Sequence, residues 1–333
     1  MAGRVDVGFA AGRTGITRRD FLKGTGMVGA ACLAAPLLSC GSRSESWEYG
    51  TIIRNGTVYD GTLAEPVKAD VGIVGDRIVA VGNLTGSACK AIDAQNCIVT
   101  PGFIDVHDHS DLMFLNAGAD RELARTLLVW SENQAALMQG VTTVISGNCG
   151  YGFTDMDEYY TFLNALPFGS NTYYLTPHGY LRQELFGSNQ PGELTSAQME
   201  RFKAKLAGEM EKGAIGMSTG LAYAPGYLAT KQELIELGKV LRRYNGIYVS
   251  HIRHDGPEAL YGRGNADIME GIQEAIDVGR QADIPVQISH IHVYVPCDAQ
   301  TPDQVIRTIE DARREGVDVT ADQYPYTAAS TVL

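Results

Sequence analysis

The amino-acid sequence predicts an α/β protein in which a small β domain is followed by a (β/α)8 barrel with about seven of its eight strand units. After residue 101, short apolar runs recur several tens of residues apart, and the stretches between them have helical periodicity. Residues 47–100 instead show short strands separated by turn residues. The chain is 44% hydrophobic and 20% charged, which excludes a disordered protein.

Residues 1–40 are predicted to be an export signal. A twin-arginine pattern runs from Thr17 to Lys23, and an uncharged, glycine-rich stretch follows it. That stretch is too poor in strongly apolar residues for a membrane span. Leu37-Leu38-Ser39-Cys40 resembles a lipobox, so the sequence leaves two destinations open, soluble in the periplasm or anchored to the cell envelope by lipid on Cys40. Because the twin-arginine route carries folded proteins, a metal or cofactor is expected further along.

Charge and cysteine content narrow the classes of partner. The formal net charge is −12, and such a surface repels nucleic acid and anionic lipid. We therefore expect no nucleic-acid partner and no membrane contact other than lipid on Cys40. Six cysteines in 333 residues are too few for a disulfide scaffold.

The small β domain is predicted over residues 41–100. Asn55-Gly56, Asp60-Gly61 and Gly75-Asp76 are typical turn pairs. They separate strands predicted at Thr51–Arg54, Thr57–Tyr59, Val71–Val74 and Arg77–Val81.

The barrel is predicted over residues 101–333. Its strands are expected at Phe103–Val106, Val141–Ile145, Thr172–Leu175, Ala214–Met217, Ile247–Val249, Val286–Ile288 and Val317–Thr320. A complete barrel takes about 250 residues, slightly more than this stretch, and no terminal cap precedes Leu333. The pattern therefore predicts a C-terminally truncated barrel.

Two of the intervening helices have predicted ends. Thr230 followed by Glu233 is expected to form a capping box, with Asn245-Gly246 as the stop. Thr301 is expected to cap another helix, with Pro302 at its first position and Gly316 after its end.

Candidate metal ligands follow the predicted strands. His107 and His109 end the first strand, and strand alternation points both side chains the same way. Cys149 follows the second strand between glycines, and His251 and His290 follow the fifth and sixth. The carboxyl ends of barrel strands converge at one mouth, where barrel active sites lie. Imidazole with thiolate favours zinc, so these five residues predict a zinc centre. The sequence gives His254 an ordinary structural role and leaves His178 unassigned.

These residues also resemble a known family. Pro101-Gly102-Phe103-Ile104-Asp105-Val106-His107-Asp108-His109 resembles the opening signature of the amidohydrolase superfamily. Gly147-Asn148-Cys149-Gly150, residues 213–226, Ser250-His251-Ile252-Arg253, Ile288-Ser289-His290 and Asp322-Gln323-Tyr324-Pro325-Tyr326 resemble N-acyl-D-amino-acid deacylases, also called D-aminoacylases. The resemblance implies zinc-dependent hydrolysis of the amide bond of an N-acyl-D-amino acid, which releases a carboxylate and a free D-amino acid.

The resemblance also implies roles for individual residues. Cys149, His251 and His290 would hold one tightly bound zinc ion, while His107 and His109 would belong to a second, weaker position. Tyr324 and Ser330 would act as catalytic residues beside the substrate carboxylate and the oxyanion. His292 and Arg253 would join Tyr324 and Ser330 in binding substrate.

Two departures from the family pattern affect these expectations. His292 stands where the family has a lysine that binds the substrate carboxylate. Carboxylate binding would therefore be weaker or pH-dependent. The family's general-base aspartate corresponds to a position beyond Leu333, so the chain by itself is expected to be inactive.

Three alternatives remain open on the sequence. Gly216-Met217-Ser218-Thr219-Gly220 matches the G-x-S-x-G pattern of serine esterases, although Ala224-Pro225-Gly226 follows where that fold needs a helix. The same metal centre could open a cyclic amide, as a dihydropyrimidinase or hydantoinase does. A non-enzymatic alternative is an inactive truncated lipoprotein.

Overall fold

The computed structural model describes residues 47–112, 133–165, 168–188, 192–255, 267–293 and 301–328. The chain divides into two compact units between Pro101 and Gly102, and each is described by itself. The predicted signal at residues 1–40, including Cys40, lies outside the described residues, as do Ser330 and the chain end. In the described part of the chain, no helix is both long and apolar enough to cross a membrane.

The first unit is a five-stranded mixed sheet. Its strands are β1 (Tyr49–Val58), β2 (Val67–Val74), β3 (Arg77–Gly82), β4 (Ala88–Asp93) and β5 (Ile98–Val99). The path is β3-β2-β1-β4, and β5 also pairs with β1. β2 and β3 form the predicted antiparallel hairpin around Gly75-Asp76, whereas β4 and β5 run parallel to β1.

The turn predicted at Asn55-Gly56 is wrong. These residues lie inside the single long strand β1, and the register with β2 shifts between Ile53 and Gly56. Asn55 has the left-handed backbone that the turn pattern implied, with φ of 65°. Its N–H donates to Asp70 and its side-chain amide to Asp93. The left-handed residue therefore makes a β-bulge, and the strand continues beyond it.

The second unit contains the predicted barrel sheet. Its strands are β6 (Phe103–Asp105), β7 (Val141–Ser146), β8 (Asn171–Pro177), β9 (Gly216–Gly220), β10 (Ile247–His251), β11 (Val286–Ile288) and β12 (Val319–Ala321). They form one seven-stranded sheet in which each strand pairs in parallel with the next along the chain. Sequential parallel pairing in a curled sheet is the pattern of a (β/α)8 barrel. The α/β prediction with about seven strand units is therefore confirmed.

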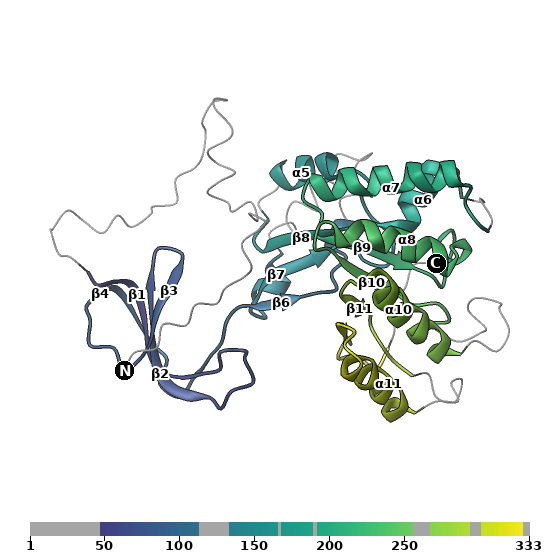
Figure 1. The fold of residues 1–333 in the computed structure, drawn as a ribbon. Coiled ribbons are helices and arrows are strands. Elements are labelled where there is room, and N and C mark those ends of the chain that lie inside the picture. Colours follow the sequence, from purple (N-terminus) through teal and green to yellow (C-terminus); the bar gives the residue numbers. More distant parts are fainter. Residues whose placement is uncertain are drawn as a thin grey trace, which may run out of the picture. The chain divides into compact units, whose positions relative to one another are not determined.

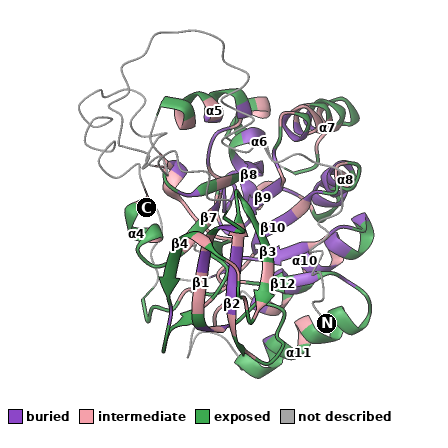
Figure 2. Cartoon of the chain, turned by 90° about the vertical axis from the view of Figure 1, so that its left-hand side faces the viewer, coloured by how far each residue is buried: buried purple, intermediate pink, exposed green. Residues whose placement is uncertain are grey.

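Helices connect these strands and lie along the outside of the sheet (Figure 1). They are α4 (Gln134–Leu137), α5 (Met156–Ala165), α6 (His178–Phe186), α7 (Ser196–Glu211), α8 (Lys231–Arg242), α10 (Ile268–Ala282) and α11 (Pro302–Arg314), with a 3-10 turn η1 at Gly226–Leu228. The apolar faces of α7, α8 and α10 cover β8 to β10, which are mostly buried (Figure 2). Because the seven strands are parallel, their carboxyl ends lie along one edge of the sheet.

Of the two predicted helix caps, the one at Thr301 forms a complete capping box, and the one at Thr230 forms only half of one. Thr301 and Gln304 form a complete capping box with Pro302 at the start of α11, and Gly316 follows that helix with φ of 90°. The Thr230 hydroxyl accepts from the Glu233 N–H as predicted. The Glu233 carboxylate does not return to Thr230, because it is buried against His178 and Arg182 in the barrel wall.

Candidate metal centre

The loop that follows β7 places a thiolate at the strand edge. Gly147, Cys149 and Gly150 have φ of 78°, 56° and 73°. A side chain at Gly147 would put its Cβ 2.2 Å from the Leu175 carbonyl oxygen, and left-handed backbone costs least for glycine. The flanking glycines therefore let the chain turn back at once and bury the Cys149 side chain at the strand ends.

The five predicted ligands converge at this point. The Cys149 Sγ lies 3.3 Å from Nε2 of His107 and 3.5 Å from Nε2 of His290. His109 joins through its own Nε2, which is 3.3 Å from that of His107. The ring of His251, the last residue of β10, lies 4.4 Å from the His290 ring, centroid to centroid. Even the first and last of them in the sequence, His107 and His290, are neighbours, with ring centroids 4.9 Å apart.

The ionisation of these groups reflects their crowding. Burial alone would raise the pKa of the Cys149 thiol, yet hydrogen bonds from four histidines, His107, His109, His251 and His290, hold that pKa well below its ordinary value. Burial opposes protonation of His107 and His290, but facing carboxylates and the thiolate raise their pKa values to about 9 and about 10. The site therefore has a strongly negative field that stabilises positive charge among the imidazoles.

Two aspartates that the sequence reasoning did not assign supply much of this field. The Asp255 carboxylate lies 3.4 Å from Nε2 of His251, 3.1 Å from Nδ1 of His290 and 3.2 Å from Nε2 of His292. Burial would raise the pKa of Asp255, but the His290 hydrogen bond and the histidine charges keep it below the ordinary value. The feature of the sequence that could have pointed to Asp255 is its position four residues after His251.

Asp322 is the second unassigned carboxylate. It follows β12, accepts from the His290 N–H at 2.7 Å and lies 3.4 Å from Nδ1 of His107. His290 has φ of 37°, so this bond anchors a strained ligand backbone. Asp322 belongs to the quoted motif that ends at Tyr326, but its position alone did not indicate a contact with two different strand ends.

Tyr223 links two of the candidate ligands. Its Oη is 3.1 Å from the Cys149 carbonyl oxygen and 3.2 Å from Nδ1 of His251. A carbonyl oxygen can only accept a hydrogen bond, so the Tyr223 phenol donates its proton to the Cys149 carbonyl oxygen. Nδ1 of His251 must then donate to the phenol oxygen. His251 then presents the lone pair of Nε2, a buried atom without a hydrogen bond among the described residues. This tautomer is the one that a metal ligand needs.

The residues fit a bound zinc ion. His107, Cys149 and His290 offer ligand atoms that all lie within 4.8 Å of one another, and so do His251, Asp255 and His290. Zinc binds sulfur at about 2.3 Å and imidazole nitrogen at about 2.0 Å, and tetrahedral ligands at these distances stand about 3.3–3.5 Å apart. The thiolate and the carboxylates also supply the negative charge that a dication requires.

Two other histidines lie outside the cluster. His178 begins α6 and is fully buried, with Nε2 2.8 Å from the Glu233 carboxylate. Arg182 donates to the same carboxylate at 3.1 Å, so His178 belongs to an ion-pair network in the barrel wall. His254 lies 3.6 Å from Glu270 on the half-buried side of its loop, in keeping with an ordinary structural role.

Of the predicted substrate-binding residues, Tyr324 and His292 lie beside the cluster and Arg253 points away from it. The Tyr324 ring lies 6.0 Å from that of His292, centroid to centroid, at the edge of the cluster. Arg253 is directed elsewhere, since its guanidinium donates to Glu274 and to the carbonyls of Tyr227 and Ala229. These contacts occupy most of its five N–H groups, so Arg253 is a structural residue in this arrangement. Ser330 lies outside the described residues.

The serine-esterase alternative is wrong. Ser218 is fully buried within β9, and a loop and the short turn η1 follow that strand instead of a helix. Its hydroxyl is bound to the backbone of the Cys149 loop. A nucleophile elbow needs an exposed hydroxyl between a strand and a helix.

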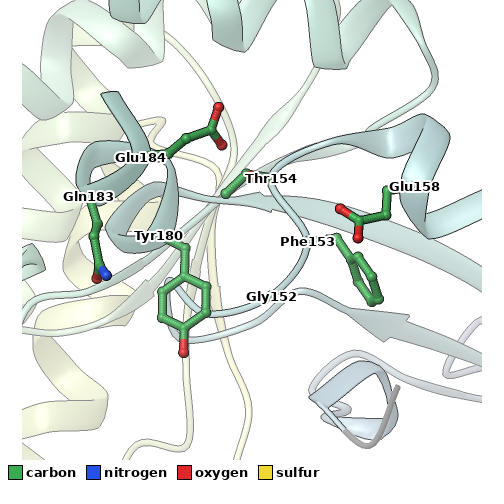
Figure 3. A pocket seen from close by; sticks show the side chains of 7 residues that line it. All are labelled: Gly152, Phe153, Thr154, Glu158, Tyr180, Gln183 and Glu184. Carbon is green, nitrogen blue, oxygen red and sulfur yellow. The ribbon is translucent and has the colours of Figure 1, made fainter. Parts of the chain in front are cut away.

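A separate pocket of about 360 Å³ lies beside the loop that follows Cys149 (Figure 3). Side chains from α5 and α6 line it, and none of the clustered histidines does. Its lining residues are Gly152, Phe153, Thr154, Glu158, Tyr180, Gln183 and Glu184. The candidate metal centre is therefore distinct from this hollow.

Comparisons with known proteins agree with the geometry. Residues 15–35 match the family model of the TAT (twin-arginine translocation) pathway signal sequence, so the chain carries a signal for export by that route. N-acyl-D-glutamate deacylase and D-aminoacylase, both of Alcaligenes xylosoxydans xylosoxydans, are 34% and 31% identical over 85% and 88% of the chain. The chain spans 58% and 60% of their lengths.

A solved structure is similar to this chain in fold and in sequence. It is an N-acyl-D-glutamate deacylase from Bordetella bronchiseptica, in complex with zinc and a phosphonate inhibitor that mimics the tetrahedral intermediate. It is 31% identical, with a TM-score of 0.69 over 84% of this chain and 59% of that one. Over most of its length the chain is therefore a homologue of the N-acyl-D-glutamate deacylases and D-aminoacylases, a family of the amidohydrolase superfamily.

Proposed function

We propose that this protein hydrolyses the amide bond of N-acyl-D-amino acids with the help of bound zinc, and releases a carboxylate and a free D-amino acid. The observation that carries the proposal is the convergence of the buried Cys149 sulfur with four histidine rings at the carboxyl ends of the barrel strands. When bound, zinc polarises an amide carbonyl and lowers the pKa of its water toward neutrality.

The chain's own residues would divide the work as follows. Cys149, His251 and His290 hold one zinc ion tightly, and His107 and His109 contribute to a second, weaker position. Asp255 and Asp322 orient the imidazole rings through their other nitrogen or their backbone, as carboxylates do around metal-bound histidines.

Tyr324 and His292 would face the substrate. Burial and the charge of Asp255 raise the pKa of the Tyr324 phenol, so the phenol keeps its proton and can donate to an oxyanion or a carboxylate. Asp255 also lies 3.2 Å from His292 and competes there with a substrate carboxylate. This contact supports weaker carboxylate binding than the family's lysine gives.

The test uses protein expressed from the complete gene and loaded with zinc. N-acetyl-D-glutamate, N-acetyl-D-methionine, their L-isomers, hydantoin and dihydrouracil are offered, and free amino acid, ring opening and bound zinc are measured. We expect D-amino acid release that chelator abolishes. Chelator-insensitive hydrolysis would refute the metal mechanism, and ring opening alone would change the substrate class to cyclic amides.

Two cysteine variants distinguish the loss of the metal centre from a general effect of removing a thiol. Cys149→Ala is expected to lose zinc and activity together, because it removes the sulfur ligand of the tightly bound zinc ion. Cys97→Ala, at an exposed free thiol in the other unit, should retain both. Full zinc content in Cys149→Ala would overturn the proposed centre.

We further propose that the exported enzyme acts at the cell envelope, either in the periplasm or anchored through lipid on Cys40. Cell fractionation of the wild type and of Cys40→Ala tests the two destinations. A lipid anchor predicts that only the wild type sediments with membranes, and a periplasmic enzyme predicts that both are released in soluble form.

A further inference from the structure

Ser218 makes two contacts with the loop that carries Cys149. Its Oγ donates to the Gly147 carbonyl oxygen and accepts from the Gly150 N–H at 3.0 Å. One hydroxyl thus closes the turn on both sides of the thiolate. Ser218 is fully buried in β9, so water cannot take over either bond.

The loop needs such support because its backbone is strained. Cys149 is a non-glycine residue at φ of 56°, a conformation that costs roughly 1–2 kcal/mol. The neighbouring Gly150 is fixed at both of its polar groups, since its carbonyl oxygen also accepts from the Tyr180 N–H at 3.0 Å. The Tyr180 bond restrains one end of the turn, and Ser218 joins that end to Gly147.

We propose that Ser218 is a positioning residue that fixes the Cys149 thiolate for metal binding. The inference rests on the proposed function only in taking Cys149 as a zinc ligand. Ser218 touches neither the thiolate nor the histidine rings in any described contact; it acts through the backbone of the turn. Removing its hydroxyl would leave two buried backbone groups without that partner and would allow the turn to open.

Ser218→Ala tests the proposal against a matched control in the next residue. Thr219 is equally buried, but its hydroxyl bonds to Tyr248 and Ser250 and makes no hydrogen bond to the loop within the described part of the chain. Thr219→Val therefore removes a buried hydroxyl from the same strand without changing the Cys149 turn. Ser218→Thr keeps the hydroxyl and serves as the conservative variant.

Three measurements are made on the whole protein. Zinc affinity is measured by competition with a chelator, cobalt-loaded protein is examined for thiolate-to-metal absorption, and labelling of the Cys149 thiol in metal-free protein is followed by peptide mass mapping. We expect Ser218→Ala to lose about tenfold or more in zinc affinity, to weaken the thiolate band and to label faster. Thr219→Val and Ser218→Thr should resemble the wild type in all three.

The outcomes separate this inference from the proposed function. Wild-type protein that binds no zinc refutes the proposed function. Wild-type protein that binds zinc, with unchanged affinity and labelling in Ser218→Ala, overturns only the role of Ser218. If Ser218→Ala does not fold, Ser218→Thr decides: retained affinity supports the role of the hydroxyl, and a tenfold loss in a folded protein contradicts it.

Discussion

The buried ion pair in the barrel wall allows a quantitative prediction. Glu233 on α8 is 1% exposed, and its carboxylate accepts from Nε2 of His178 at 2.8 Å and from Nε of Arg182 at 3.1 Å. Glu233→Gln keeps the shape but removes the negative charge, and it leaves the fully buried Arg182 without that counter-ion. Removing one partner of a buried pair costs about 3–5 kcal/mol.

Glu236 provides a control on the same helix. It is paired with Lys203 at 2.7 Å and with Lys239 at 2.6 Å, but its side chain is 26% exposed. Exposed pairs contribute about 0–1 kcal/mol, so Glu236→Gln should lower the free energy of unfolding by no more than that. The same substitution thus has different expected costs at two positions one helical turn apart.

Urea unfolding followed by circular dichroism measures both variants. For a unit of this size, a loss of 3–5 kcal/mol also lowers Tm by about 6–20 °C, which a thermal melt measures. A cost below about 1 kcal/mol for Glu233→Gln, or equal costs for the two variants, would show that burial does not make the Glu233 network important for stability.

Three further predictions concern other features of the chain. Gly147→Ala should lower the free energy of unfolding by at least about 2 kcal/mol and should also lower the zinc content, because Gly147 has φ of 78° and a Cβ there would lie 2.2 Å from the Leu175 carbonyl oxygen. Urea unfolding and metal analysis measure the two effects, and an unchanged unfolding free energy with unchanged zinc content would contradict this reasoning. Thr301→Ala removes the cap of α11 and should cost about 1 kcal/mol, which a thermal melt beside Thr301→Ser checks, since serine keeps the hydroxyl. Burial alone would raise the pKa of Glu233, but its contacts with His178 and Arg182 hold it below 4.5. Its stabilisation is therefore complete above that pH and is lost as the pH falls through the folded pKa, so unfolding free energy between pH 3 and 7 should fall more steeply in the wild type than in Glu233→Gln.

Local sequence pattern predicted the architecture because each strand and helix is encoded by its own short stretch. The apolar runs located all seven strands of the barrel sheet, although β9 begins at Gly216 where the run suggested Ala214. Pattern failed at Asn55-Gly56, since a left-handed pair serves equally well in a turn and in a bulge. The choice between the two depended on Asp70, a residue on another strand.

The sequence by itself determined which chemical groups the strand ends carry: a thiol between glycines, and imidazoles, gathered by the common direction of parallel strands. Strand alternation does not align His107 and His109 as predicted, because β6 ends at Asp105. Only the tertiary structure decided how those groups are oriented and charged. Asp255 and Asp322 contact histidines from other strand ends, whereas His178 and Arg253 are directed into ion pairs away from the cluster. Periodicity is a property of neighbours along the chain, while hydrogen bonds and ionisation depend on distances between segments that meet only when the sheet curls.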